Sequence, residues 1–359
     1  MYSKRGFLGM SLVLVGVGVL TYRAFSPDPT GPRIPQFLRV HFATQEDGWA
    51  LTSQGLAQSA NGGRTWQWSV RWSPPLSAVG VPSMASWHRT LWVAVHHRIV
   101  RESLANGTSH WIPSPVRAST MATMVWTSRR YGWILAAPQG ISAESEAVQV
   151  WTTTNGGGTW HQRSAPFVGV KTGLSVGGIP EQLWLGSTHM FHGSPLLWHA
   201  PKEPALRWQS AALPSPVVVQ SHLRQTLGAP LWLAPLHGVL LVELLAPGAN
   251  AGPIAVYRTQ NGGNRWTWQG MLDRSKTLGT STTIDRSGGW TALAHRSTTT
   301  IVHWVDHSHH MAWRMVSTVP GTVNQLTAVG STLWVLITTP AGRTELWRSQ
   351  SAGDHWQRM

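Results

Sequence analysis

Four copies of one short turn motif constrain the fold of this chain more than any other feature. Three copies are close to identical in pattern, and the fourth has diverged: Ser59-Ala-Asn-Gly-Gly-Arg-Thr-Trp66, Thr153-Thr-Asn-Gly-Gly-Gly-Thr-Trp160, Thr259-Gln-Asn-Gly-Gly-Asn-Arg-Trp266 and Ser349-Gln-Ser-Ala-Gly-Asp-His-Trp356. The glycines permit the positive φ angles of a tight hairpin, and the Asn side chain caps amides of the turn. We call these four segments the repeat turns, and each predicts a hairpin whose outgoing strand is anchored by its Trp.

A second repeat places a Trp inside an apolar run after a small-residue turn. Its seven copies centre on Trp49, Trp92, Trp133, Trp184, Trp232, Trp290 and Trp334. Their spacing of roughly 40 to 60 residues is the length of a four-stranded propeller blade. The chain is therefore predicted to be all-β, a seven-bladed β-propeller of four-stranded antiparallel blades. The repeat turns follow the odd copies, and the even blades are expected to keep only a closing Trp, at Trp111, Trp198 and Trp313.

Strands are predicted to recur about every ten residues, with Gly, Pro, Asn or Ser between them. Blade one should contain strands at 37–43, 49–53, 56–59 and 65–70, and blade seven at 323–329, 333–338, 345–349 and 355–358. Residues 34–40 should form the inner strand of blade one or reinforce the seam, and blade seven should end in a very short strand. Residues 201–216 and 246–253 are expected to be loops, and residues 239–245 an inner or a second strand.

The repeat turns resemble the Asp-box (BNR) repeat of sialidases, sortilin-type receptors and the photosystem II assembly factor. The overall likeness, over residues 36–359, is to that assembly factor and its bacterial relatives, with Asn or Ser at the position that names the box. The resemblance implies a non-catalytic platform that binds another protein, without a cofactor. It also implies that the box residues are scaffold on the face opposite the ligand: Ser59, Asn61, Gly63, Trp66, Thr153, Asn155, Gly157, Trp160, Thr259, Asn261, Gly263, Trp266, Ser349, Gly353 and Trp356.

The N-terminus has the pattern of an export signal. Lys4 and Arg5 precede an apolar stretch from residue 6 to 22, so residues 1–23 are predicted to be a hydrophobic helix serving as a signal anchor or a cleaved signal peptide. Residues 24–35 would form a Pro-rich linker, and residues 36–359 the propeller. We therefore expect an extracytoplasmic domain held by a single-pass anchor, or secreted if cleavage occurs.

Charge is sparse and mostly positive. Charged residues make up 12% of the chain and the formal net charge is +14, against about 25% charged residues in an average domain. A carboxylate with a pKa near 4 loses its charge in strong acid, whereas Asn in the repeat turns does not titrate. One hypothesis is therefore that the propeller faces an acidic exterior, and the alternative is drift in a repeat that tolerates Asn. The absence of Cys excludes disulfides and thiolate metal sites.

Cationic residues are predicted to gather on the face opposite the repeat turns. They fall in turns between second and third strands and in links between blades: His96, His97, Arg98, Arg117, Lys276, His295, Arg296 and Arg343. Glu144, Glu146 and Asp273 are the acids expected there. Such a face would attract an anionic partner, either a protein or an acidic glycan, and the alternative is a scattered, solvated surface. No nucleic-acid partner is predicted, and the chain is expected to be a monomer.

Enzymatic and metal-binding alternatives rest on fewer residues. Arg33 lies in an Arg-Ile-Pro segment like that of sialidases, but Tyr131 and Tyr257 are poorly placed for a nucleophile, and sialidase propellers have six blades. Glu144, Glu146 and Asp273 would have to supply paired carboxylates for another glycoside hydrolase. The segment from His303 to His310 could ligate a metal but is more consistent with a polar turn. A carbohydrate-binding propeller could use Trp72 or Trp208, so no catalytic residue and no metal site are assigned.

Overall fold

The computed structural model describes residues 36–76, 83–104, 107–118, 121–137, 148–166, 170–179, 181–188, 196–201, 207–214, 224–227, 229–245, 249, 252–277, 279–284, 288–307 and 310–359. Within these ranges, some side chains are not described, including those of Asp273 and Lys276. The predicted N-terminal helix and linker lie outside the described residues. Within the described part, no helix is long and apolar enough to cross a membrane.

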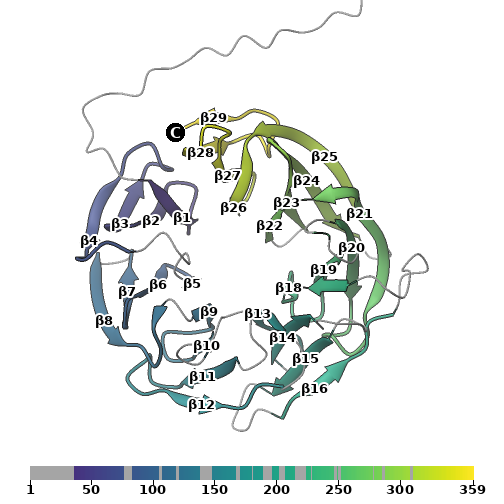
Figure 1. Cartoon of the computed structure of the whole chain (residues 1–359), viewed down its shortest axis with the longest axis horizontal. Coiled ribbons are helices and arrows are strands. Elements are labelled where there is room, and N and C mark those ends of the chain that lie inside the picture. Colours follow the sequence, from purple (N-terminus) through teal and green to yellow (C-terminus); the bar gives the residue numbers. More distant parts are fainter. Residues whose placement is uncertain are drawn as a thin grey trace, which may run out of the picture. The chain divides into compact units, whose positions relative to one another are not determined.

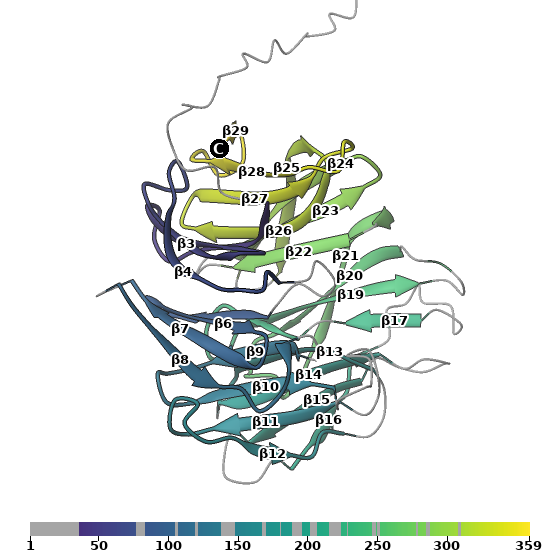
Figure 2. The ribbon, with the colours of Figure 1, turned by 60° about the vertical axis from the view of Figure 1, so that its left-hand side comes forward.

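The described residues form a ring of seven antiparallel sheets, so the predicted seven-bladed propeller is confirmed (Figure 1). Each blade uses consecutive strands, from the inner to the outer edge. Figure 2 shows the strands of one blade side by side, for example β10, β11 and β12. Blades one to three comprise β1 (Phe37–Phe42), β2 (Asp47–Thr52), β3 (Gly55–Ala60), β4 (Gln67–Arg71); β5 (Met84–Trp87), β6 (Thr90–Val95), β7 (Arg98–Ser103), β8 (Thr108–Pro113); and β9 (Met121–Trp126), β10 (Gly132–Ala136), β11 (Gln149–Thr153), β12 (His161–Arg163).

The other four blades follow the same order, with one extra strand in blade five. Blades four and five comprise β13 (Val170–Gly177), β14 (Gln182–Thr188), β15 (Leu196–Pro201), β16 (Gln209–Ala211); and β17 (Arg224–Leu227), β18 (Leu231–Trp232), β19 (Gly238–Leu245), β20 (Gly252–Thr259), β21 (Thr267–Thr277). Blades six and seven comprise β22 (Gly279–Ile284), β23 (Gly288–His295), β24 (Thr298–Asp306), β25 (Met311–Pro320); and β26 (Thr322–Val329), β27 (Thr332–Thr338), β28 (Thr344–Ser349), β29 (Gln357–Arg358). The strands predicted for blades one and seven agree with these bounds within about two residues.

Blade five corrects one sequence prediction. Trp232 was predicted to lie on a second strand, but it ends β18, which pairs with the start of β19. β17 pairs with the other end of β19, so β17 and β18 together occupy the inner-strand position and β19 is the second strand. The Trp232–Gly238 pair matches the Phe42–Gly48 and Trp126–Gly132 pairs at the same place in blades one and three. The apolar run around Trp232 therefore lies on an inner strand, whereas its likeness to the other copies indicated a second strand.

Two of the three predicted closing Trp residues are also corrected. Trp198 lies on β15, a third strand, and Trp208 immediately precedes the fourth strand β16, inside a segment that was predicted to be a loop. Trp111 lies on a fourth strand but pairs with Val100, which matches Trp68 opposite Ala57 in blade one, two residues beyond the repeat-turn Trp. Trp313 does hold the closing position, because it pairs with Trp304, which lies opposite Gly289 as Ser59 lies opposite Gly48.

The repeat turns connect third to fourth strands, as predicted, and each is held by the same hydrogen bonds. In blade three the amide of Gly157 donates to Thr153 Oγ1 at 2.9 Å, and the amide of Thr159 donates to Asn155 Oδ1 at 2.9 Å. The Asn155 amide group also donates to Thr159 Oγ1 at 3.0 Å, a bond that a carboxylate could not donate. Gly157 has a φ of 92°, which a residue with a Cβ rarely adopts.

Three repeat turns are preceded by a polar residue that reaches the following blade. Gln58 donates to the buried carboxylate of Glu102. Arg258 donates to the carbonyl of His307 at 2.6 Å and pairs with Asp306. The third is Arg348, which crosses the seam between the last blade and the first.

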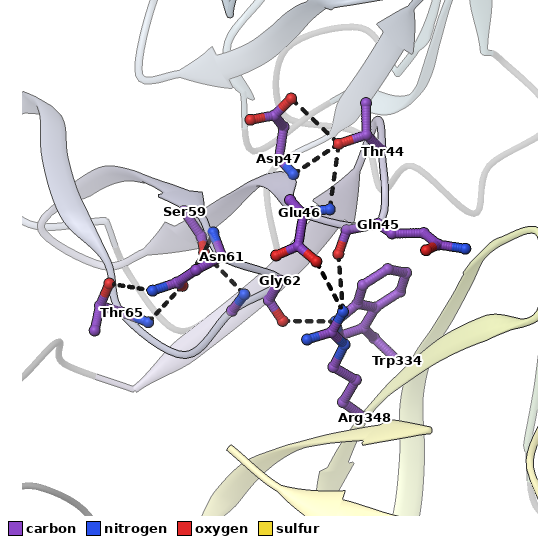
Figure 3. Close-up of polar contacts among 11 residues, drawn as sticks. Thr44, Gln45, Glu46, Asp47, Ser59, Asn61, Gly62, Thr65, Trp334 and Arg348 are labelled. Atoms are coloured by element: carbon purple, nitrogen blue, oxygen red, sulfur yellow. Dashed lines mark hydrogen bonds and ion pairs between the residues drawn. The ribbon is translucent and has the colours of Figure 1, made fainter. Parts of the chain in front are cut away.

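That seam joins blades seven and one without a shared strand. Arg348 Nη2 donates to the carbonyl of Gln45 at 3.1 Å and lies 3.7 Å from Glu46 Oε1 (Figure 3). Burial lowers the pKa of Arg348, and the neighbouring Glu46 carboxylate opposes that shift. The indole of Trp334 donates to the carbonyl of Gly62 at 3.0 Å. β1 is the inner strand of blade one and β29 has two residues, so both predictions about closure are confirmed.

Candidate functional site

Antiparallel order within each blade sorts the turns onto two ends of the ring. One end carries the turns between second and third strands together with the links between blades, and we call it the link face. The opposite end carries the first-to-second turns and the repeat turns, and we call it the repeat-turn face. The repeat turns therefore lie on the end opposite the predicted cationic residues. Their lack of a ligand role stays a prediction.

The predicted cationic residues all belong to segments of the link face. His96 and His97 form the turn between β6 and β7, and Arg98 begins β7. Arg296 lies in the turn after β23, and Arg343 ends the turn before β28. The others lie at a strand end or in a link: Arg117 follows β8, Lys276 lies near the end of β21, and His295 ends β23. His97, Arg98, Arg117, Arg296 and Arg343 are exposed, whereas His96 and His295 are half-buried.

Most of these residues form an arc over four consecutive blades, numbers six, seven, one and two. Sequence analysis missed one further member, Arg71, which ends β4 on the link face with its guanidinium 4.6 Å from the ring of Trp68. Arg71 pairs with Gly55, which directly follows the turn between the second and third strands, and Arg71 therefore lies on the link face. We call the exposed arginines of this set the cationic arc: Arg71, Arg98, Arg117, Arg296 and Arg343.

No Asp or Glu occurs in the link-face turns and links of these four blades. Glu345, on β28 beside Arg343, accepts a hydrogen bond from the indole of Trp347 at 3.1 Å and pairs with Arg358 at 3.2 Å. Glu144 and Glu146 belong to blade three and lie outside the described residues. The backbone of Asp273 lies on β21 of blade five, away from the arc. The link face is therefore positive over one half of the ring.

The repeat-turn face is mixed in charge. Exposed arginines occur there in the turns of four blades, including Arg64, Arg89, Arg129 and Arg265. Most of the described acids lie on the same face: Glu46, Asp47, Glu181, Asp306 and Asp354. Opposite charges within one face reduce its attraction for an anionic partner, so the cationic arc is the better candidate.

The backbone of two arc turns is unusual. His96 and Arg296 each hold the first position of a two-residue hairpin and have φ angles of 52° and 51°. Gly, Asn or Asp is preferred at such positions, and other residues are disfavoured there. Neighbouring links support both turns, because the amide of Ala118 donates to the His96 carbonyl at 2.7 Å and Thr322 Oγ1 donates to the Arg296 carbonyl at 3.3 Å. The fold thus presents long cationic side chains at positions where local preference favours small ones.

The tyrosines considered as catalytic nucleophiles do not lie together in one site. Tyr257 lies on β20, fully buried between blades four and five, and burial raises its pKa to about 12. Its hydroxyl is therefore protonated at neutral pH. Tyr131 precedes β10 on the repeat-turn face, and Arg33 lies outside the described residues.

The histidine segment that could bind a metal forms the hairpin between β24 and β25. The rings of His307 and His310 are 5.1 Å apart, and Asp306 is occupied by Arg258 and by His237 Nδ1 at 3.3 Å. Within the described residues, which omit His309, no group of three ligands could hold a metal ion. The first four residues of the segment, from His303 to Asp306, lie on β24, and the predicted polar turn is limited to the connection that follows Asp306.

The two Trp residues proposed for sugar stacking are packed instead. The indole of Trp72 donates to the Ser53 carbonyl at 2.9 Å, and its ring contacts the core between blades one and two. The indole of Trp208 donates to the Ser164 carbonyl at 2.7 Å and packs between blades three and four. Neither ring is exposed.

Comparison with known proteins supports the β-propeller fold and does not identify a function. No family model matches the sequence, and no curated protein matches it. The structure is similar to YCF48 bound to a D1 peptide, with 14% identity, a TM-score of 0.54, and coverage of 89% of this chain and 92% of that chain. It is also similar to the Cps50 (Swd1) β-propeller domain of Myceliophteria thermophila, with 10% identity, a TM-score of 0.57, and coverage of 89% and 98%.

A third similar structure comes from a study of two prolyl endopeptidases. Its identity is 9% and its TM-score 0.56, and the match covers 90% of this chain but 50% of that chain. Propellers of this shape therefore occur both in binding proteins and within enzymes. At these identities the likeness shows the β-propeller fold alone.

Proposed function

We propose that this chain is a non-catalytic β-propeller that serves as a protein-binding or assembly platform, exported from the cytoplasm and anchored by its N-terminal segment. The observation that carries the proposal is the cationic arc: five exposed arginines over four consecutive blades, in turns and links without an acid. Such a surface attracts an acidic segment of a partner protein and speeds its encounter at low salt.

Two further observations support this reading. An arginine guanidinium is suited to bidentate recognition of carboxylates, and the arc presents five of them. YCF48, which shares the fold, was solved with a bound peptide, so a propeller of this kind can present a peptide-binding surface. We also infer that the repeat turns are Asp-box repeats in which Asn replaces the name-giving Asp.

The test is capture of partners from the native cell envelope by two matched variants. The arc variant replaces His96, Arg98, Arg296 and Arg343 with Gln. The control variant replaces His88, Arg64, Arg129 and Arg265 with Gln, and so removes one histidine and three arginines from exposed positions of the repeat-turn face. His88 has a φ of 51°, close to that of His96, so each variant replaces one His in this backbone conformation with Gln, and the arc variant places a second Gln in it at Arg296.

We expect the arc variant to lose the acidic partner while the control variant keeps it, with both retaining the melting temperature of the parent within a few degrees. The loss should be larger at low salt, because exposed charges are screened within about 10 Å at 0.1 M ionic strength. Equal capture by the arc variant and the parent would rule the arc out as the binding surface.

The alternative functions differ in what they require of a ligand. A glycoside hydrolase would turn over a glycan, and a carbohydrate-binding propeller would bind one without turnover. A glycan array on the purified protein, followed by hydrolysis assays on any bound glycan, separates both alternatives from a protein-binding platform.

A further inference from the structure

Trp111 departs from the other tryptophans of this fold. All 23 tryptophans lie in the described part of the chain, and Trp111 alone is exposed, with 39% of its surface accessible. Its equivalents on the fourth strands of blades one and five pack against cores between blades: Trp68 and Trp268. Burial of a large aromatic side chain stabilises a fold by about 2–3 kcal/mol, and Trp111 forgoes part of that gain.

The exposed indole belongs to a cationic corner of blade two. The guanidinium of Arg98 lies 5.7 Å from the centroid of the Trp111 ring, within the range of a cation–π contact. The link after β8 folds over the His96–His97 turn, because the amides of Ser114 and Ala118 donate to the His97 and His96 carbonyls. This brings the segment that carries Arg117 to the same turn. We call Trp111, Arg98, His97 and Arg117 the blade-two corner.

Among the described residues of blade two, no acid opposes the charge of the corner. Glu102 is the only acid between residues 83 and 118. It is fully buried and accepts hydrogen bonds from Gln58, Ser69 and Ser109, on the side facing blade one. The exposed groups of the corner are thus two arginines, one histidine and the indole of Trp111.

We propose that the blade-two corner is a binding subsite for a carboxylated sugar, such as a uronic acid unit of an anionic glycan. The exposed indole offers a flat apolar surface to the C–H face of a pyranose ring. The Arg98 guanidinium offers parallel N–H donors to the sugar carboxylate beside that surface. His97 and Arg117 add positive potential around the site.

The pairing of ring and guanidinium is what favours a sugar acid over other anions. A free phosphate or an acidic peptide side chain would use the cations and leave the indole without a role. A neutral sugar would use the indole and leave Arg98 without a role. The subsite shares Arg98 with the cationic arc, so it rests in part on the proposed function. Trp111 belongs to the subsite alone, which allows the two to be tested separately.

The experiment is calorimetric titration of the full chain at low salt with tetragalacturonate and with its fully methyl-esterified form. The ester keeps the sugar rings and lacks the carboxylates. The variants are Trp111→Ala, Trp111→Phe and Arg98→Gln. Arg265→Gln is the control, since Arg265 is an exposed arginine of the repeat-turn face and lies outside the cationic arc.

We expect the parent chain to bind the acid form and to prefer it over the ester. Trp111→Ala should weaken binding at least about tenfold, the usual effect of losing an aromatic anchor, while Trp111→Phe keeps part of the affinity. Arg98→Gln should abolish the preference for acid over ester, and Arg265→Gln should leave both affinities unchanged. Because Trp111 is exposed, its replacement by Ala should leave the melting temperature within a few degrees.

Two results would overturn the subsite. One is a parent chain that does not bind tetragalacturonate at millimolar concentration, and the other is a Trp111→Ala variant that binds it as tightly as the parent. If Trp111→Ala instead loses an oligoglutamate peptide and not the sugar, the corner recognises acidic protein segments. The subsite and the proposed function can fail separately. If Trp111→Ala binds tetragalacturonate as tightly as the parent, the subsite is wrong. If Trp111→Ala also captures the protein partner while the arc variant does not, the proposed function still stands.

Discussion

The rings of Phe42 and Trp334 stack across the seam of the propeller, with centroids 3.9 Å apart and planes at 6°. Trp126 and Trp92 form the same contact inside the chain, between blades three and two, at 4.5 Å and 8°. In both pairs the first residue ends an inner strand and the second lies on the second strand of the preceding blade. The ring is thus closed by a contact that it also uses between covalently consecutive blades.

Phe42→Ala should lower the free energy of unfolding by about 3–5 kcal/mol, the usual effect of truncating a buried aromatic residue. Trp126→Ala should have an effect of similar size. Only the seam variant should raise amide hydrogen exchange in β1 and β28, because those strands have no covalent connection across the junction. Chemical denaturation and hydrogen exchange of both variants would show this. A Phe42→Ala variant that loses less than about 1 kcal/mol would mean that closure depends on other contacts.

Deletion of residues 356–359 should destabilise the ring by several kcal/mol. Trp356 packs against the core between blades six and seven, and its indole donates to Ser317 Oγ at 2.9 Å. The amide of Met359 also donates to the Leu346 carbonyl at 2.9 Å. As a control, Gln357→Ala with Arg358→Ala retains the backbone of β29. Thermal unfolding should separate the two, and unchanged stability of the truncated chain would contradict the prediction.

Asn155→Ala should lower stability by about 1–2 kcal/mol, because it leaves the amide of Thr159 in the turn without its side-chain acceptor. Partner binding on the link face should persist. Asn155→Asp should fold well at neutral pH, since a carboxylate also accepts that bond.

The Asp variant should become sensitive to acid. A carboxylate that accepts an amide hydrogen bond has a pKa below its unfolded value of about 3.9, so its contribution is present above that value and lost as the pH falls through the folded pKa. Denaturation at pH 7, 5 and 3 should show a widening gap between Asn155→Asp and the parent. A constant gap would remove the argument that Asn suits an acidic exterior, and so would unfolding of the parent itself near pH 3.

His41 should make the parent less stable in mild acid. Its ring stacks on Trp49, and burial lowers its pKa to about 4, below the value of about 6.5 expected in the unfolded chain. Between these two values the unfolded chain binds a proton that the native state does not, so stability falls as the pH drops from about 6.5 to 4 and then levels off. His41→Gln should flatten this part of the profile, as measured by urea denaturation from pH 7.5 to 3.5. An unchanged slope in the variant would assign it to other groups, such as His199, whose pKa burial also lowers.

The repeats determined the architecture because each depends on local chemistry. The Gly and Asn residues of a repeat turn specify a hairpin by their own backbone preferences and hydrogen bonds, and seven Trp-centred runs at blade spacing indicate seven sheets. The bounds of the strands in blades one and seven followed from the same alternation of apolar and turn residues. The placement of cationic turns on one face followed from antiparallel order within each blade.

Tertiary structure alone decided which tryptophan holds which place. Trp232 ends an inner strand, Trp198 lies on a third strand, and Trp111 is exposed although Trp68 at the equivalent position is packed. A short apolar run around a Trp has the same local pattern on any strand of a blade. Its role is set by the strand with which it pairs and by the neighbouring blade that covers it. Both depend on residues far away in the sequence, so the motifs fixed the number of blades while packing between blades determined which side chains remain available for a partner.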